Sequence, residues 1–279
     1  MSETGPVALV TGASRGVGKG VATALGATGW TVYVTARGGI GPDDPLGQTI
    51  SEIEDAGGSA VGVSLDHADD GAVAGLFRQI HAEQGRLDLL VNNVWAAPKG
   101  FGGFSDKFWE RPVSDWDTLI TVGVRAHYVA CVEAAKIMVP QGSGLMVNIS
   151  SFGTRGHLHS VLYGMSKAAL DKMAFDMAHE LEGTGVAAIS LWLGLIQTEL
   201  LLSLGIEEFA GFRLDEAEHP QFVGRVIDRL WRDPSLLENN GHSLVTAELG
   251  ASYGLTNNDG GLPKSHREPF GGGPLFPPS

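Results

Sequence analysis

The residues best suited to catalysis in this sequence are a tyrosine and a lysine, Tyr163 and Lys167, in the segment YGMSK. In a helix, residues four apart lie on the same face, so the two side chains would project together. A lysine ammonium beside a phenol favours the phenolate and lowers a pKa that starts at about 10. Such a tyrosine can act as a general acid or base near neutral pH. Because this spacing also occurs by chance in many helices, the pair alone leaves a structural role open.

Ser151 is a third candidate catalytic residue. It ends a predicted strand that immediately precedes the helix carrying the tyrosine and lysine. The carboxyl ends of parallel strands meet at one edge of a sheet, where ligands bind in open α/β folds. Its hydroxyl could therefore hydrogen-bond a carbonyl oxygen. His157 and His159 lie in the loop between Ser151 and Tyr163, where they could contact a substrate, although exposed or structural roles are the commoner fate of such histidines.

A glycine-rich segment at residues 11–18, TGASRGVG, is a candidate phosphate-binding loop. It lies between a buried strand predicted at 7–11 and a helix predicted at 16–27. Its glycines allow a sharp turn and a close approach to a pyrophosphate, and the helix N-terminus offers unpaired N–H groups. In a chain with 40 glycines, such a cluster could also be only a tight turn. We expect cofactor contacts from Gly12, Ser14, Arg15, Gly16, Val17 and Gly18.

The end of the second predicted strand, 31–35, indicates which dinucleotide this loop would hold. A cofactor without a 2′-phosphate is usually bound there by an acidic side chain, whereas a 2′-phosphate requires a cation. The sequence has Arg37 at this point and no carboxylate. Arg15 and Arg37 could hold one phosphate from two sides through charge-assisted hydrogen bonds. An isolated arginine is more often simply solvated, but the two together predict that NADP(H) is preferred over NAD(H).

The segments that must position these residues alternate between strands and helices. Such alternation, with continuous apolar strands, predicts a parallel sheet covered on both faces by helices. A capping box formed by Ser114 and Asp117 is expected to open the longest helix. Strands are predicted at 7–11, 31–35, 60–65, 87–91, 145–150 and 187–193, and helices at 16–27, 46–56, 70–84, 114–138 and 162–181.

The pattern indicates one domain, residues 1–256, followed by a tail rich in glycine and proline at 257–279. The tail is expected to be irregular, either loose or packed on a neighbouring surface. Two long loops, 95–113 and 198–220, follow carboxyl ends of strands and are expected to form the substrate side.

Composition excludes several other classes of function. The chain has 279 residues, a net charge of −13 and a pI near 5.0, which disfavours binding to nucleic acid or anionic lipid. No apolar stretch approaches the roughly 20 residues that span a bilayer. A single cysteine, Cys131, and an N-terminus without a signal-peptide pattern suggest a cytoplasmic protein. No cluster of histidine, cysteine and acidic residues has the spacing of a metal site.

Together, these motifs resemble the short-chain dehydrogenase/reductase family over nearly the whole chain, to about Gly250. The resemblance implies a doubly wound Rossmann fold with a seven-stranded, mostly parallel sheet. It implies Tyr163 as proton donor to the substrate oxygen, Lys167 as the partner that lowers its pKa and binds the nicotinamide ribose, and Ser151 as the residue that positions the carbonyl. The implied cofactor contacts elsewhere are Asp66 near the adenine, Asn92 near the adenine ribose and the sheet, Thr198 near the carboxamide, and Gly194 and Ile196 after the sixth strand.

Within the family, the chain resembles the branch called dehydrogenase/reductase member one. The segments that carry this resemblance are KFWE at 107–110, VGVRAHY at 122–128, SLW at 190–192 and QTELL at 197–201. The branch is associated with NADPH-dependent reduction of carbonyl compounds. The family also commonly assembles through its two long central helices, which implies a homo-oligomer, either a dimer or a tetramer.

Three departures from the family pattern concern the proposed site. The segment after the fourth strand reads Asn92-Asn93-Val94-Trp95 instead of ending in alanine and glycine. Trp95 could line the nicotinamide pocket, stack on a flat substrate, or pack under the long loop. Gly123 stands where the family has a catalytic asparagine in the central helix, so the proton relay must differ. Leu193-Gly194 replaces a Pro-Gly pair.

The sequence therefore predicts an NADPH-dependent enzyme that reduces the carbonyl of an apolar ketone or aldehyde. Its substrate pocket would include Trp95, Ser151 and Tyr163. One alternative is the reverse reaction, oxidation of an alcohol with NAD(P)+. A second is a non-catalytic regulator that binds NADP(H). Retention of both Tyr163 and Lys167 favours catalysis.

Overall fold

A computed structural model describes residues 5–98, 106–209 and 211–270. Its centre is a seven-stranded sheet in the order β3-β2-β1-β4-β5-β6-β9, in which every neighbouring pair is parallel. The α/β class and the seven-stranded sheet expected from the sequence are thus confirmed. The strands are β1 (Val7–Val10), β2 (Thr31–Ala36), β3 (Ser59–Ser64), β4 (Leu89–Asn92), β5 (Gly144–Ser151), β6 (Val186–Leu193) and β9 (Ser243–Val245).

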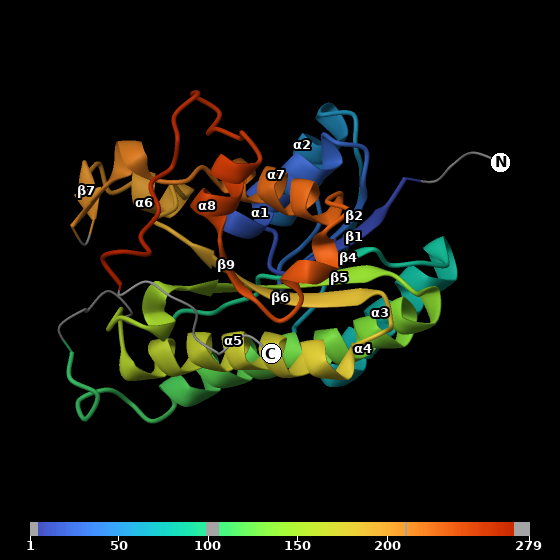
Figure 1. The fold of residues 1–279 in the computed structure, drawn as a ribbon, viewed down its shortest axis with the longest axis horizontal. Helices are drawn as coiled ribbons and strands as arrows, with labels where there is room; N and C mark the ends of the chain where they lie inside the picture. The colour runs from blue at the N-terminus through green and yellow to red at the C-terminus, as the bar shows by residue number, and fades with distance from the viewer. Residues whose placement is uncertain (1–4, 99–105, 210, 271–279) are drawn as a thin grey trace.

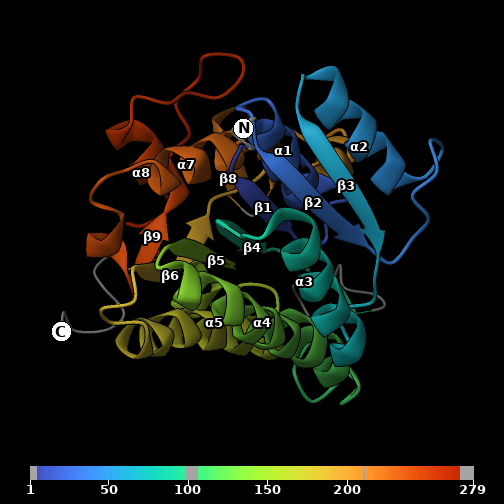
Figure 2. The same ribbon diagram turned by 90° about the vertical axis from the view of Figure 1, so that its right-hand side faces the viewer.

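Helices cover both faces of this sheet (Figures 1 and 2). One face is covered by α1 (Gly16–Gly26), α2 (Pro45–Asp55), α7 (Pro220–Trp231) and α8 (Thr246–Ser252). The other is covered by α3 (Asp70–Gln84), α4 (Ala126–Gln141) and α5 (Val161–Glu180). The remaining elements are the π-helix η1 (Asp117–Arg125), the 3-10 helices η2 (Phe152–Thr154), η3 (Leu214–Glu216) and η4 (Leu236–Asn239), the short helix α6 (Glu199–Leu202), and the hairpin of β7 (Glu208–Phe209) and β8 (Phe212–Arg213).

The central strands are apolar along their whole length because each face is buried. In β1, Ala8 and Val10 pack towards α1, α2 and α7, whereas Val7 and Leu9 pack towards α3, α4 and α5. All four side chains are fully buried. This arrangement accounts for the continuous apolar run in the sequence, since alternation would require one solvated face.

The structure departs from the predicted elements in several places, and α7 and α8 fall outside every predicted helix. The seventh strand, β9, has only three residues, Ser243–Val245, and no sequence signal located it. The expected capping box at Ser114 and Asp117 is wrong. The N–H of Asp117 donates to the carbonyl of Ser114, and η1 begins without a side-chain cap. The segment 198–220, expected as a loop, contains α6, the β7–β8 hairpin and η3.

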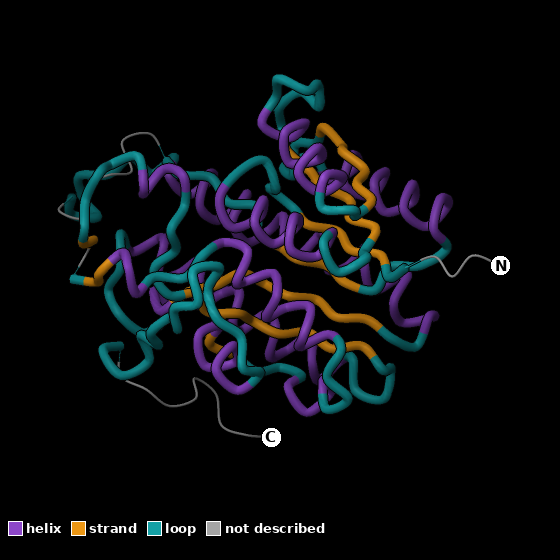
Figure 3. Tube along the Cα trace, turned by 90° about the horizontal axis from the view of Figure 1, so that it is seen from above, coloured by secondary structure: helices purple, strands orange, loops and turns teal. Residues whose placement is uncertain are grey.

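The order of the strands fixes where a ligand can bind. Connections from β1 and β4 leave in opposite directions across the sheet, which opens a crevice at their carboxyl ends. The hairpin β7–β8 and the longer loops lie at the end of the molecule opposite the N-terminus (Figure 3). Within the described ranges, no helix combines the length and apolarity needed to cross a membrane.

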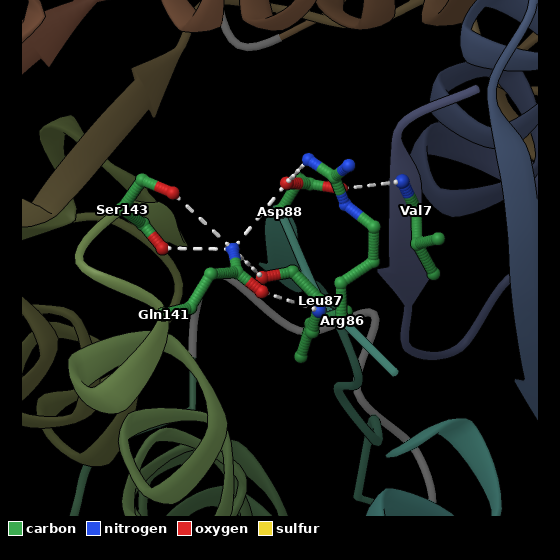
Figure 4. A network of polar contacts seen from close by, with 6 residues as sticks. All are labelled: Val7, Arg86, Leu87, Asp88, Gln141 and Ser143. Carbon is green, nitrogen blue, oxygen red and sulfur yellow. Dashed lines mark hydrogen bonds and ion pairs between the residues drawn. The ribbon is translucent and has the colours of Figure 1, made fainter. Parts of the chain in front are cut away.

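A polar network ties the opposite edge of the sheet together (Figure 4). The buried carboxylate of Asp88, just before β4, accepts a hydrogen bond of 2.8 Å from the N–H of Val7 at the start of β1. It also accepts two from the guanidinium of Arg86, at 2.8 and 2.6 Å. The amide of Gln141, at the end of α4, donates to Asp88 and to the carbonyls of Leu87 and Ser143. This edge is structural and lies away from the carboxyl ends of the strands.

Candidate active site

The structure brings Ser151, Tyr163 and Lys167 together at the carboxyl edge of the sheet. Ser151 is the last residue of β5, and the other two lie in the first two turns of α5. The Oγ of Ser151 lies 2.9 Å from the phenol oxygen of Tyr163. Ser160 caps α5 by accepting a hydrogen bond of 3.2 Å from the N–H of Tyr163. The cap fixes the start of the helix and therefore the position of the phenol.

Lys167 is buried beneath this pair. Only 7% of its surface is exposed, and its Nζ donates a hydrogen bond of 3.0 Å to the carbonyl of Ile149 in β5. The Nζ also lies 5.6 Å from the centre of the Tyr163 ring. Burial lowers the pKa of Lys167 to about 8, although the carboxylate of Asp171 opposes this shift. The ammonium therefore still predominates over the neutral amine at pH 7, by about tenfold.

The pKa of Tyr163 differs in direction from the sequence-based expectation. Burial raises it above its ordinary value of 10, and the hydrogen bond with Ser151 offsets only part of that shift. Burial is the main cause of this difference, and the Nζ of Lys167 donates its hydrogen bond to the carbonyl of Ile149. A neutral tyrosine in this state retains its proton, as a general acid must before it reacts.

Asp171, which the sequence reasoning did not single out, lies one further turn along α5. Its buried carboxylate accepts hydrogen bonds from the Oγ of Ser190 and, at 2.9 Å, from the Nε1 of Trp192, both in β6. Burial raises its pKa, and its hydrogen bonds act in the opposite direction. The i, i+4, i+8 row of Tyr163, Lys167 and Asp171 is the sequence signal that could have found it.

The glycine-rich loop has the close packing that its glycines allow. Gly12 and Gly16 have φ angles of 67° and 57°, in the left-handed region that favours glycine. A Cβ on Gly18 would come within 2.4 Å of the Nδ2 of Asn93 and of the carbonyl oxygen of Gly12. The Asn93 amide in turn donates to the carbonyls of Thr11 and Gly12, at 2.9 and 3.0 Å. Asn93, absent from our predicted site residues, thus braces the loop and also lines the large cavity described below.

Asn92, which was expected near the adenine ribose and the sheet, is fully buried within the sheet. Its Nδ2 donates to the Oδ1 of Asn148 at 3.1 Å and to the Sγ of Cys131 at 3.2 Å. Its side chain thus links β4 to β5 and α4. The neighbouring residue, Asn93, lines the large cavity.

The predicted 2′-phosphate contacts lie on the surface. Arg15 and Arg37 are both exposed, and neither forms an ion pair within the described part of the chain. Ser14 and Val17 are half-buried beside them. Asp66 is exposed, and its carboxylate accepts a hydrogen bond of 3.0 Å from the N–H of Ala68. Exposed guanidinium groups and a tight glycine turn are features that suit the phosphates of a dinucleotide, so the chemistry of these residues fits such a cofactor.

Glu199, in the first turn of α6, contacts the same loop. Its carboxylate accepts a hydrogen bond of 2.9 Å from the N–H of Gly16. A negatively charged group therefore already lies at the N-terminus of α1, as the helix dipole favours. This carboxylate must move before a phosphate can accept a hydrogen bond from the same N–H.

A cavity of about 710 Å³ joins the glycine-loop side of the site to the catalytic residues. Its walls include Ser151, Tyr163, Lys167, Gly194, Ile196 and Thr198. Thr198 caps α6 by accepting a hydrogen bond from the N–H of Leu201, and its methyl group faces Gly16. Leu200, Leu201 and Leu204 make one wall apolar. The predicted residues after β6 therefore lie in the same cavity as the tyrosine and lysine.

Trp95 also lines this cavity. Its ring centre lies 6.2 Å from that of Tyr163, in an edge-to-face arrangement, and 38% of its surface is exposed. Gly123, in η1, is buried directly beneath it, and a Cβ there would lie 3.5 Å from the Cδ1 of Trp95. Trp95 and Gly123, two of the three departures from the family pattern, are therefore neighbours. The indole of Trp95 covers the position at which the family has its catalytic asparagine.

Glu218 is a buried carboxyl group that the sequence reasoning missed. Only 1% of its surface is exposed, and its Oε1 accepts a hydrogen bond of 2.9 Å from the N–H of Gly194 in the cavity wall. Its Oε2 is buried and has no hydrogen-bond partner among the described residues. Burial raises the pKa of Glu218 to about 8, which the bond from Gly194 only partly offsets. The side chain is therefore mainly neutral at pH 7.

We expect Glu218→Gln to change how stability depends on pH. Glu218 titrates at about 8 in the folded chain and at about 4.5 when unfolded, so wild-type stability falls as pH rises through this window. The glutamine resembles the neutral carboxyl and does not titrate. Relative to wild type, the variant should gain more than about 1 kcal/mol between pH 5 and pH 8.5, since one pKa unit corresponds to about 1.4 kcal/mol. Urea unfolding at both pH values measures this gain, and an identical pH dependence in both proteins would contradict it.

Comparison with known proteins identifies the class that this fold and site define. A family model described as short chain dehydrogenase matches residues 6–208. The chain belongs to the short-chain dehydrogenase/reductase family of oxidoreductases.

The chain is 42% identical over 267 residues to Dehydrogenase/reductase SDR family member 1 of Mus musculus, covering 92% of this chain and 84% of that protein. The resemblance to this branch is thereby confirmed. A short-chain type dehydrogenase/reductase from Mycobacterium marinum has a similar structure, with a TM-score of 0.72 and 26% identity, covering 87% of this chain and 94% of that chain. A metagenomic short-chain oxidoreductase in complex with NADP matches with a TM-score of 0.67 and 29% identity, covering 84% and 93% of the two chains.

Proposed function

We propose that this protein is an NADPH-dependent reductase of apolar ketones or aldehydes, with Tyr163 as the proton donor. The observation that carries the proposal is the 2.9 Å contact between the Ser151 hydroxyl and the Tyr163 phenol, placed over the buried Lys167 in the wall of the large cavity. A carbonyl oxygen in front of this pair can accept a hydrogen bond from each hydroxyl.

The chain's own residues hold and move the proton. Ser151 orients the carbonyl oxygen, and Tyr163 donates its phenolic proton to that oxygen as the carbonyl carbon is reduced. A bound reduced nicotinamide supplies the hydride for that carbon. Lys167 stabilises the resulting phenolate by its charge, and the leucine and tryptophan walls exclude water from the reacting atoms. The same residues serve the reverse oxidation of an alcohol, and the ratio of reduced to oxidised cofactor decides the direction.

The preference for NADP(H) is supported by two exposed arginines, Arg15 in the glycine-rich loop and Arg37 directly after β2. The metagenomic structural relative binds NADP. We also propose that the protein forms a homo-oligomer through η1, α4 and α5. In support, large side chains on or directly before these elements are exposed: Trp116, which precedes η1, and Tyr128, Val139, Val161 and Met165.

Titration calorimetry with NADPH and NADH, repeated on Arg37→Ala, tests the cofactor. Wild type should bind NADPH more tightly than NADH. Loss of the charge-assisted contacts to the 2′-phosphate should weaken NADPH binding about 10- to 100-fold, since such bonds contribute about 1.5–3 kcal/mol. NADH binding should change little.

Arg78→Ala, at an exposed site on α3, is the matched control and should leave both affinities unchanged. Equal wild-type affinities for the two cofactors would remove the argument for a phosphate site. If neither cofactor bound, the proposed function itself would be wrong.

A further inference from the structure

A second cavity, of about 110 Å³, adjoins the large one at the catalytic residues. Ser151, Tyr163 and Gly194 line both cavities. We call the second cavity the aromatic chamber, because its remaining walls consist mainly of rings: Phe152, His159, Phe209, Phe212, His266 and Phe270. A carbonyl held by the Ser151 and Tyr163 hydroxyls would therefore lie at the mouth of this chamber.

The rings of the aromatic chamber form an ordered set rather than a loose apolar patch. Phe152 and Phe270 are stacked, with ring centres 5.5 Å apart and an interplanar angle of 27°. Phe212 and His266 are stacked more closely, at 4.0 Å and 18°. Phe152 is itself fixed from behind by an edge contact with Trp192 of β6, at 5.1 Å. The walls are thus already in place to receive another flat ring.

Two of these rings come from the C-terminal segment, which was expected to be loose or packed on a neighbouring surface. The described part of this segment, residues 257–270, packs on this chain's own site. The guanidinium of Arg267 donates to both carboxylate oxygens of Glu248 in α8, at 2.7–2.9 Å, and the Oγ of Ser265 donates to the same carboxylate at 2.7 Å. The Phe270 ring rests against Gly156, where a Cβ would come within 2.3 Å of its Cδ1.

The aromatic chamber has no charged group near neutral pH. Burial lowers the pKa of His159 to about 4, and the nearby Lys167 ammonium acts in the same direction. Burial likewise lowers the pKa of His266. The chamber's other wall residues carry no ionisable side chain except Tyr163, whose phenol is neutral here. An ionised substituent would be desolvated in this cavity with no charged side chain in its wall, which is unfavourable.

We propose that the aromatic chamber binds a single uncharged aromatic ring attached to the substrate carbonyl, so that aryl ketones are the preferred substrates. This inference rests on the proposed carbonyl reduction for the position of the reacting oxygen. At about 110 Å³ the chamber is smaller than the cavity of about 150 Å³ that can hold benzene, so the ring would extend in part into the adjoining large cavity. Offset and edge-to-face ring contacts favour a flat aromatic group over a saturated ring of similar size.

The test compares acetophenone with cyclohexyl methyl ketone, whose rings have the same number of carbon atoms. With NADPH and the full chain, kcat/KM for acetophenone should exceed that for cyclohexyl methyl ketone about 10-fold, the effect of two or three ring contacts. Phe270→Leu keeps an apolar side chain but removes one ring, and it should lower this ratio about threefold or more. NADPH affinity should stay unchanged in that variant.

Leu262→Ala serves as the control, because this leucine is in the same segment but is 67% exposed and lies outside the aromatic chamber. The ratio should not change in it. Equal wild-type kcat/KM values for the two ketones, or an unchanged ratio in Phe270→Leu, would overturn the ring site.

Binding of the two ketones to the protein with NADP+, measured by saturation-transfer NMR, separates this inference from the proposed function. If neither ketone is reduced, but acetophenone binds preferentially and loses this preference in Phe270→Leu, the aromatic chamber stands and carbonyl reduction fails. If both ketones are reduced equally well and bind equally well, the reductase stands and the inference about the ring fails.

Discussion

Tyr163→Phe should lower kcat for ketone reduction about 1000-fold while leaving NADPH affinity within about twofold of wild type. The substitution removes only the phenol oxygen, which lies 2.9 Å from the Ser151 hydroxyl and carries the proton that the product needs. General acid catalysis by a positioned side chain contributes typically about 100- to 10 000-fold. The ring itself remains to pack against Trp95 and Gly153, so the cavity should keep its shape. Single-turnover kinetics with saturating NADPH measure the loss.

Tyr128→Phe provides the matched control for this substitution. Tyr128 lies on α4, and 53% of its surface is exposed, so the same loss of one hydroxyl should leave kcat unchanged. A Tyr163→Phe enzyme that retained more than a tenth of wild-type kcat would show that another group supplies the proton. A large loss of NADPH affinity in that variant would instead indicate a role in binding.

Much of this site could be predicted from the sequence because its residues are fixed by local structure. Tyr163 and Lys167 share a helix face, and Ser151 ends a strand, so spacing alone brings them to one edge. The glycine loop follows from its place between β1 and α1. Residues fixed by long-range packing were not predictable in this way. Glu218 reaches Gly194 across 24 positions, and Phe270 reaches Phe152 from the C-terminal segment, so neither has a local signal.

The direction in which the Tyr163 pKa shifts could not be predicted from the sequence either. The i, i+4 spacing predicts that the tyrosine and lysine share a face, but it does not show how deeply both are buried. Desolvation depends on the whole cavity wall, and it outweighs the neighbouring hydrogen bond at Tyr163. The strand β9 could not be predicted from local sequence either. Its three residues form a strand because Ser190, Leu191 and Trp192 of β6 pair with them. A short strand of this kind is defined by its partner rather than by its own pattern.

The largest effect on stability is expected at the edge of the sheet away from the site. Asp88→Ala should lower the free energy of unfolding by about 3 kcal/mol, mainly because the buried N–H of Val7 loses its acceptor. The charge of Arg86 adds less, since 43% of its side chain is exposed to solvent. Urea unfolding followed by circular dichroism gives this difference, with an unchanged dependence on urea if the denatured state is the same.

Two further variants show which part of the network matters. Asp88→Asn keeps an oxygen for the N–H of Val7 but loses the charge, so it should cost less than half as much as Asp88→Ala. Asp70→Ala removes the partner of Arg125 in an ion pair that is exposed on both sides, and stability should hardly change. If Asp70→Ala destabilised the chain as much as Asp88→Ala, surface charge would govern stability. Equal losses in the alanine and asparagine variants at Asp88 would instead assign the effect to its charge rather than to the buried backbone N–H.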